Sequence, residues 1–321
     1  MRESTGSLGK KAATLAGGFS AEWLDPVAVR EYRRLLRSPF VVTAFLGLHL
    51  VALLAVMMES GIVALWVAGG GGSLPPMEGL LAAVNTVIFG GLLPLAHFSS
   101  LQSELGRGRN AELLVMAGLD PWRIVGGRVL AATGIGALLL VSVLPYWMLR
   151  YFLGGFDVME FCGMLLQWLF SNLSMNAIVI GASVFAPVAG RACLILACLA
   201  VRQMLELPYE MSAKGLLGID LPAWVGKVMI ALLFTIAGGM IGIAKMHPMR
   251  HAAGRDESRL VVVLLLLCVP FLHSLAFAFG GALGGLAALL GLIFLFYQIA
   301  PLPRRKKRLK HRGGGTLLGT P

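Results

Sequence analysis

The residues best suited to chemistry in this chain lie in one charged segment, Leu101–Arg128, between two long apolar runs. Its ionisable side chains are Glu104, Arg107, Arg109, Glu112, Asp120, Arg123 and Arg128. The segment also holds an adjacent leucine pair, Leu113 and Leu114. Apolar side chains give a docking surface its contact area, and charges around them orient the partner. We therefore expect this segment to dock another protein, with an ordinary solvated loop as the alternative.

Motifs for catalysis or nucleotide binding do not occur in the sequence. Gly226-Lys227 lacks both the upstream glycine and the following hydroxyl of a phosphate-binding loop, and no metal-binding Cys/His spacing is present. The cysteines lie in apolar runs without a C-x-x-C pair, so we interpret them as small hydrophobes: Cys162, Cys193, Cys198 and Cys268. We expect no catalytic residue, no metal and no cofactor bound by this chain itself.

The composition indicates a membrane protein. Of its 321 residues, 57% are hydrophobic and 13% charged, whereas soluble domains carry about 25% charged residues. The mean hydropathy is +0.81. Several continuous apolar runs reach the roughly 20 residues that a membrane-crossing helix requires. We predict an all-α polytopic fold with about eight spans: 40–59 (extending to 67 in a longer version), 78–98, 123–149, 158–187, 191–207, 222–245, 259–279 and 282–301.

The distribution of charge predicts the orientation of these spans. The net charge of +11 is concentrated in the N-terminal 39 residues, the charged segment, the 246–259 loop and the tail, while the alternate loops hold few basic residues. Cytoplasmic loops are rich in Lys and Arg, so both termini are expected on the cytoplasmic side of the membrane. We expect this membrane to be a plasma membrane, a bacterial inner membrane in particular. The basic tail, 303–321, is expected to contact anionic lipids, and nucleic-acid binding is not.

A helix is predicted at residues 25–39, after a segment at 1–24 that we expect to be flexible. Asp25-Pro26 combines an N-cap carboxylate with a proline suited to the first helical position. The apolar side is expected to hold Ala28, Val29, Tyr32, Leu35 and Leu36, and the basic residues follow the opposite side: Arg30, Arg33, Arg34 and Arg37, with Glu31 beside them. Such a helix lies in the membrane interface, and a simple positive anchor is the alternative.

The charged segment itself is expected to form two short helices joined by an elbow. Gly118 suits a helix C-cap, and Asp120-Pro121 repeats the N-cap and proline device at the start of the next span.

Polar residues inside the spans are the remaining candidates for function. Asn172 and Asn176 lie one helical turn apart, so they either line a transport pathway or bond a neighbouring helix. We expect Glu59 at the outer end of the first span and His97 at the inner end of the second.

Two elements of the sequence resemble ABC-2 type transporter permeases. Asp25 to Pro39, "DPVAVREYRRLLRSP", is similar to that family's N-terminal interface helix. Glu112-Leu113-Leu114, followed by "GLDPWRIV" and Gly127-Arg128, is similar to its loop between the second and third spans. The sequence departs from the family at Arg109-Asn110-Ala111, where Gly-Thr-Leu is usual, and at Arg128, which replaces lysine.

The resemblance covers about residues 25–245. It implies a six-helix core, with an extra C-terminal hairpin, inside a transmembrane domain at 40–302. It also implies a coupling segment at about 99–122 that docks on a separate ATP-binding subunit, where ATP and Mg²⁺ bind. The coupling residues would be Glu104, Arg107, Arg109, Glu112, Leu113, Leu114, Asp120 and Pro121. A second copy or a related permease completes the dimer. The implied function is export driven by ATP hydrolysis.

Three other classes of function are weighed against this one. A gradient-driven transporter needs membrane carboxylates, for which Glu59 is the candidate. A lipid-modifying enzyme needs a cluster of His, Asp or Glu near one interface, and the pair His247 and His251 is a weak match. A membrane scaffold or regulatory subunit derived from a permease is the third.

Overall fold

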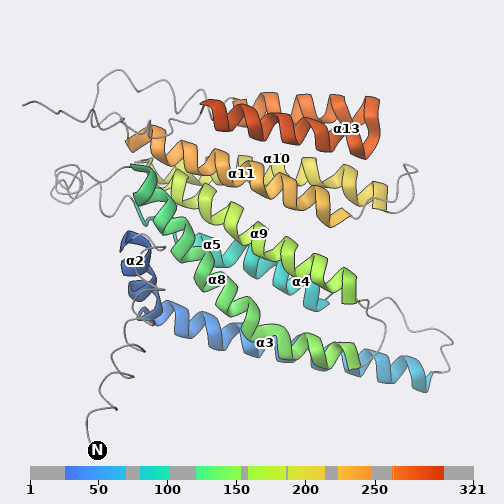
Figure 1. Ribbon diagram of the computed structural model, residues 1–321. Coiled ribbons are helices and arrows are strands. Elements are labelled where there is room, and N and C mark those ends of the chain that lie inside the picture. Colours follow the sequence, from blue (N-terminus) through green and yellow to red (C-terminus); the bar gives the residue numbers. More distant parts are fainter. Residues whose placement is uncertain are drawn as a thin grey trace, which may run out of the picture.

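The computed structural model describes residues 26–69, 80–101, 121–152, 158–185, 187–213, 223–246, 262 and 264–299. All regular elements within these ranges are helices (Figure 1). In chain order they are α2 (Pro26–Leu36), α3 (Pro39–Ala68), α4 (Leu80–Val87), the π-helix η1 (Ile88–Leu92), α5 (Leu93–Leu95), α8 (Pro121–Phe152), α9 (Val158–Ala182), α10 (Val188–Ala213), α11 (Ala223–Met246), the π-helix η3 (Leu264–Cys268) and α13 (Val269–Ile299).

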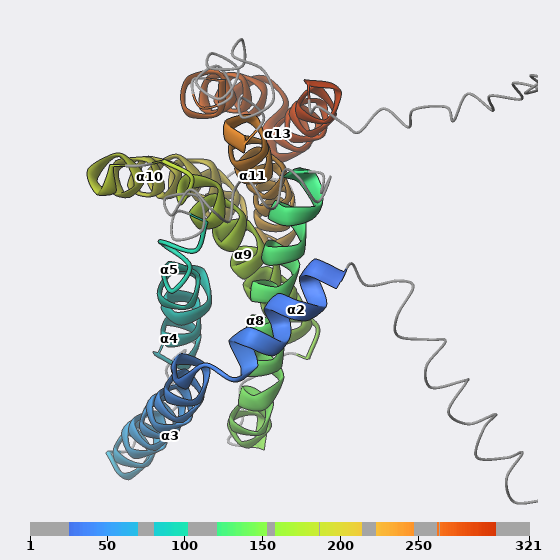
Figure 2. The same cartoon turned by 90° about the vertical axis from the view of Figure 1, so that its left-hand side faces the viewer.

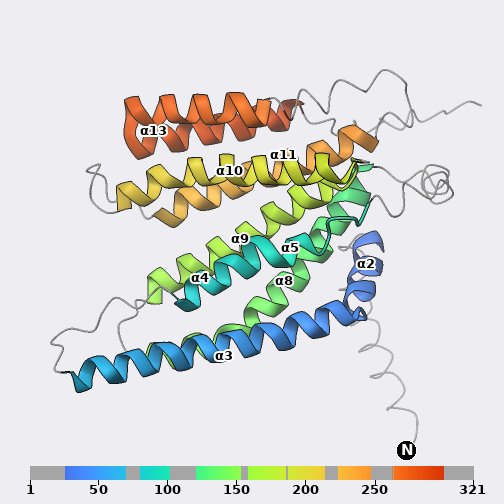
Figure 3. The same cartoon turned by 180° about the vertical axis from the view of Figure 1, so that it is seen from behind.

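The long helices run in similar directions, and α2 lies across their ends (Figures 1 and 2). Seen from behind, α3 extends away from α2 along one edge of the bundle, while α13 covers the opposite edge (Figure 3). The short helix α2 packs mainly on α8, and α9 packs mainly on α11. This arrangement places the starts of α3, α8 and α10 and the end of α5 near one another.

The long apolar helices support a polytopic membrane protein. Five of them are long and apolar enough to cross a membrane: Pro39–Ile62, Pro121–Phe152, Phe161–Ala182, Val188–Tyr209 and Trp224–Ile243. The apolar helices Leu80–Leu95 and Leu283–Leu295 are shorter. The predicted count of eight spans is therefore not confirmed. The expected fifth span, 191–207, lies within α10, a helix of 26 residues that accommodates Pro208.

Glycines allow α9 and α11 to touch through their backbones. A methyl group on Gly181 would meet the carbonyl oxygen of Gly238, and one on Gly238 would lie 2.6 Å from the carbonyl carbon of Ala177. Gly238 and Gly242 are four residues apart on α11, so they share one face of that helix. Small residues at this spacing let membrane helices approach closely, which agrees with the extensive packing of α9 on α11.

The C-terminal hairpin turns at the predicted position. Gly281 interrupts α13 with φ 59° and ψ −151°, a region that residues with a Cβ rarely adopt. After this turn, Gly284 approaches the carbonyl oxygen of Ala276 in the first half of the hairpin. The hairpin is joined to α10 by a buried hydrogen bond of 3.1 Å between the Tyr209 hydroxyl and Nε2 of His273.

Candidate functional site, a polar junction beneath helix α2

The turn at residues 96–101 is the centre of the candidate site. It follows α5 directly and is closed by backbone hydrogen bonds, among them those that His97 and Phe98 donate to Pro94 and Leu95, each 3.0 Å long. The structure describes this turn as far as Leu101, whose side chain is 1% exposed. The turn therefore forms a compact end to the apolar helix Leu80–Leu95, with Leu101 buried.

Arg128, from the second turn of α8, connects this turn with α2. Its Nη1 donates a hydrogen bond of 2.9 Å to the Ser100 carbonyl oxygen, and its Nη2 lies 3.9 Å from Oε1 of Glu31. Arg128 is 6% exposed and Glu31 is 7% exposed. Leaving one of two buried charged partners alone is strongly destabilising, so this contact fixes α2, α8 and the turn relative to one another.

Arg191 and Ser183 hold the same turn from the other side. Nη1 of Arg191, in the first turn of α10, donates a hydrogen bond of 3.0 Å to the Phe98 carbonyl oxygen, and its guanidinium lies 4.7 Å from the centre of the Phe98 ring. The Leu101 amide donates a bond of 3.2 Å to Oγ of Ser183, just after α9. Five helical elements, α2, α5, α8, α9 and α10, thus meet at one turn. We call this set of contacts the polar junction.

Helix α2 packs on α8 through small residues and one carboxylate. A methyl group on Gly127 would lie 3.2 Å from the Ala28 amide nitrogen, and one on Gly134 would lie 3.2 Å from the Tyr32 ring. The predicted arginine face is confirmed, since Arg30, Arg33, Arg34 and Arg37 are exposed. Leu36 was expected on the apolar face, but it is 42% exposed because α8 contacts the side of α2 that contains Ala28, Glu31 and Tyr32.

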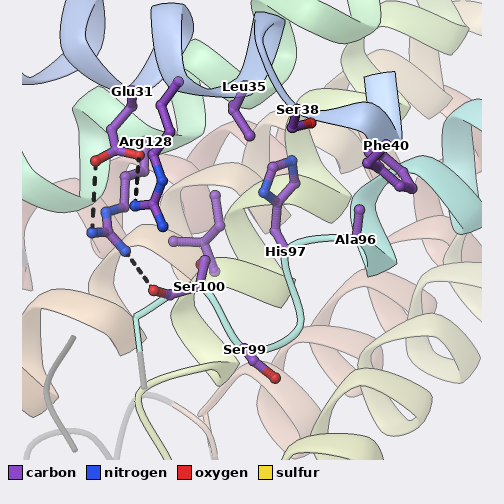
Figure 4. A pocket seen from close by; sticks show the side chains of 11 residues that line it. Glu31, Leu35, Ser38, Phe40, Ala96, His97, Ser99, Ser100 and Arg128 are labelled. Carbon is purple, nitrogen blue, oxygen red and sulfur yellow. Dashed lines mark hydrogen bonds and ion pairs between the residues drawn. The ribbon is translucent and has the colours of Figure 1, made fainter. Parts of the chain in front are cut away.

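A cavity of about 440 Å³ opens between α2 and the 96–101 turn. Figure 4 shows the His97 ring pointing into it toward Ser38, with Leu35 and Phe40 on either side and the Glu31–Arg128 contact at the far wall. Burial, and after it the positive charge of Arg128, lower the pKa of His97 from 6.5 to about 4, although Glu31 acts in the opposite direction. The imidazole is therefore neutral at pH 7.

Most of the predicted coupling residues lie outside the described residues: Glu104, Arg107, Arg109, Glu112, Leu113, Leu114 and Asp120. Pro121 is described, and it is the first residue of α8, as its pairing with Asp120 predicted. The two described ends that flank 102–120 are Leu101, held in the polar junction, and Pro121, the start of α8.

Asn172 and Asn176 join neighbouring helices. Nδ2 of Asn172 donates a bond of 3.0 Å to the Phe89 carbonyl oxygen in the π-helix η1, and Nδ2 of Asn176 donates one of 2.9 Å to Oδ1 of Asn172. Asn176 also lies 3.4 Å from the hydroxyl of Thr133 on α8. Both side chains are 1% exposed. These contacts support the interpretation that both asparagines bond a neighbouring helix, and not the one that they line a transport pathway.

Two buried ion pairs were missed by the sequence reasoning. Glu59 is not solvated at the end of its span. It is 2% exposed, lies 2.9 Å from Nε of Arg150 and accepts a 3.0 Å bond from the Leu81 amide. Arg202 on α10 donates a hydrogen bond of 2.6 Å to Glu206 and one of 3.0 Å to the Ser174 hydroxyl. The i,i+4 spacing of Arg202 and Glu206 was a usable signal, whereas no sequence spacing links Glu59 with Arg150.

Comparison of the chain with protein-family models, with curated proteins and with solved structures found no match. The resemblance to ABC-2 type permeases therefore depends on the residues quoted above.

Proposed function

We propose that this chain is the membrane-spanning permease subunit of an ATP-binding cassette exporter. A separate subunit binds ATP and Mg²⁺, and its hydrolysis cycle drives substrate movement across the membrane. The chain acts as a dimer, either with a second copy or with a related permease. The polar junction is the observation that carries this proposal.

The junction is suited to distributing a mechanical displacement. Segment 102–120 continues covalently into α8 at Pro121 and, at its other end, into the turn that Arg128, Arg191 and Ser183 hold. A partner that moves this segment would move α8, a helix of 32 residues. The same movement would transmit force through the polar junction to α2, α9 and α10. Packed helices respond to such a force by shifting between discrete arrangements, and alternating access requires shifts of this kind.

The buried carboxylates favour an external energy source over an ion gradient. An ion-coupled transporter needs a membrane carboxylate that can bind and release its ion. The buried carboxylates of the described spans are Glu59 and Glu206, and each is ion-paired with an arginine at 2.9 Å or less. The gradient-driven alternative therefore has weaker support than the ATP-driven one.

The proposal is tested by measuring Mg-ATP hydrolysis in the complex purified from native membranes through a tag on this chain. Wild-type preparations are expected to contain an ATPase, and the double substitution Leu113→Asp with Leu114→Asp is expected to lose it, because charges replace apolar contact area. Leu317→Asp with Leu318→Asp, the same change in the basic tail, is the matched control and should keep it. Wild-type complexes without ATP hydrolysis, or an aspartate pair at 113–114 that retains it, would contradict the proposal.

A further inference from the structure

We infer that the cavity between α2 and the 96–101 turn binds an uncharged amphiphile through a polyol head group, such as glycerol or a sugar. Two polar side chains of its wall have no hydrogen-bond partner among the described residues. The hydroxyl of Ser38 is buried, and the ring of His97 points toward it (Figure 4). Buried polar groups normally have a partner, so a ligand in the cavity would satisfy both side chains.

The charged side chains of the wall contact one another. Glu31 lies 3.8 Å from Arg34 and 3.9 Å from Arg128, and Arg128 also donates to the Ser100 carbonyl oxygen. Both arginines have further interactions as well. A charged ligand would have to compete with these contacts, because Glu31 repels an anion and the two arginines repel a cation. The wall therefore favours a ligand without charge.

A hydroxyl group matches the hydrogen-bonding groups of the wall, because it both donates and accepts. The Ser38 hydroxyl also does both, and the neutral imidazole of His97 has one N–H donor and one acceptor nitrogen. The carboxylate of Glu31 accepts only. An ionised phosphate would offer acceptors alone and an ammonium group donors alone, so each would leave part of this set unmatched. A head group with several hydroxyls can bond to all three side chains.

The size and the apolar part of the cavity favour an amphiphile over a free polyol. Its volume of about 440 Å³ lies within the range of roughly 300–1,000 Å³ that is usual for ligand sites. Leu35, Phe40 and Ile180 give it an apolar wall. Phe40 lies in the first turn of α3, and Val51 and Leu54, on the same side of that helix, are 39% and 50% exposed. The apolar chain of the ligand can continue along this surface.

The inference is tested with the purified full chain in lauryldimethylamine oxide, a detergent whose head group has no hydroxyl. The test needs no ATPase, so it can fail separately from the proposed function. Thermal unfolding and native mass spectrometry follow titrations with octylglycerol, octyl glucoside, octyl phosphate, octyltrimethylammonium and free glycerol. Octylglycerol or octyl glucoside is expected to bind saturably and about fivefold more tightly than the other three probes, the factor that one hydrogen bond of about 1 kcal/mol supplies. The tighter of the two identifies the head group as glycerol or a sugar.

Three results would overturn the inference. Equal or tighter binding of octyl phosphate or octyltrimethylammonium would mean that charge decides the binding. Equal binding of free glycerol would remove the role of the apolar wall. Saturation by none of the probes would mean that the cavity takes up solvent alone.

Two variants and a matched control localise the binding. Ser38→Ala is expected to weaken it about fivefold, because one hydrogen bond of about 1 kcal/mol is lost. Ser60→Ala is the control and should bind as wild type, since the Ser60 hydroxyl bonds to the Met57 carbonyl oxygen within α3 and does not line the cavity. Ala96→Leu fills the cavity without removing a polar group and should also weaken binding. Unchanged binding in both Ser38→Ala and Ala96→Leu would place the amphiphile elsewhere and overturn the inference.

Discussion

The most consequential single residues are charges buried among apolar helices. Glu59 on α3 is paired with Arg150 at the end of α8 and also accepts the Leu81 amide at the start of α4, so one carboxylate joins three helices. A carboxylate near a helix N-terminus is favoured, because amide groups there lack partners within the helix. These contacts explain how a charge inside a mostly apolar surrounding contributes to the fold.

Neutralising Glu59 therefore has a definite expected outcome. Glu59→Gln should lower the free energy of unfolding by about 3–5 kcal/mol, because it breaks a buried ion pair in which the Glu59 carboxylate lies 2.9 Å from Nε of Arg150. Adding Arg150→Met should recover at least half of that loss, since no buried charge then remains at the site. Denaturant titration followed by circular dichroism measures both values. Arg33→Met, at an exposed arginine of α2, is the control and should stay within about 0.5 kcal/mol of wild type. A Glu59→Gln protein as stable as the control would contradict this account.

At the scale of elements, the sequence predicts helices better than it predicts their contacts. The Asp120-Pro121 signal places the start of α8 correctly, and the apolar runs give approximate bounds for α9, α10 and α11. Hydropathy does not reveal that α4 passes into a π-helix at Ile88–Leu92, where the Phe89 carbonyl accepts from Asn172. That feature depends on a neighbouring helix, and π-helical turns often occur at functional sites.

The contact between α9 and α11 gives a prediction that compares adjacent glycines. Gly238→Ala should destabilise the protein by about 1–3 kcal/mol, because its methyl group would lie 2.6 Å from backbone atoms of Ala177 and Ile178, which cannot rotate away. Gly239→Ala is the matched control. The nearest atom there is Cζ3 of Trp122 at 3.9 Å, so the methyl fits and the higher helix propensity of alanine should be neutral or stabilising. Thermal unfolding in detergent distinguishes the two, and equal behaviour would contradict the close packing.

At the scale of the whole molecule, sequence periodicity identifies the apolar helices but not the polar junction. Arg128 and Arg191 lie in separate helices, and only the fold brings them to one turn. Each arginine would be costly alone in an apolar bundle, so its burial depends on a backbone carbonyl of the turn after α5, that of Ser100 for Arg128 and that of Phe98 for Arg191. Arg128 and Arg191 thus stand out in the sequence as charged residues in apolar helices, but the sequence does not show which groups they contact.

The distribution of basic residues predicts how the molecule is oriented in the membrane. The exposed arginines of α2 and the polar junction lie at the same end of the bundle, while α3 and α8 end at the opposite side (Figures 1 and 3). The excess of Lys and Arg on cytoplasmic surfaces predicts that the α2 end faces the cytoplasm.

Cysteine labelling tests this orientation in a background with Cys162, Cys193, Cys198 and Cys268 changed to alanine. In intact cells, a membrane-impermeant maleimide should label Gly69→Cys and Phe152→Cys at the far ends of α3 and α8, but not Leu36→Cys or Val188→Cys at the α2 end. In inverted membrane vesicles the pattern should reverse, because the α2 end then faces the reagent. All four positions are exposed, so accessibility within the protein does not limit the reaction. Labelling of Leu36→Cys and Gly69→Cys from the same side would mean that α3 does not cross the membrane, and a wholly reversed pattern would place the polar junction outside the cytoplasm.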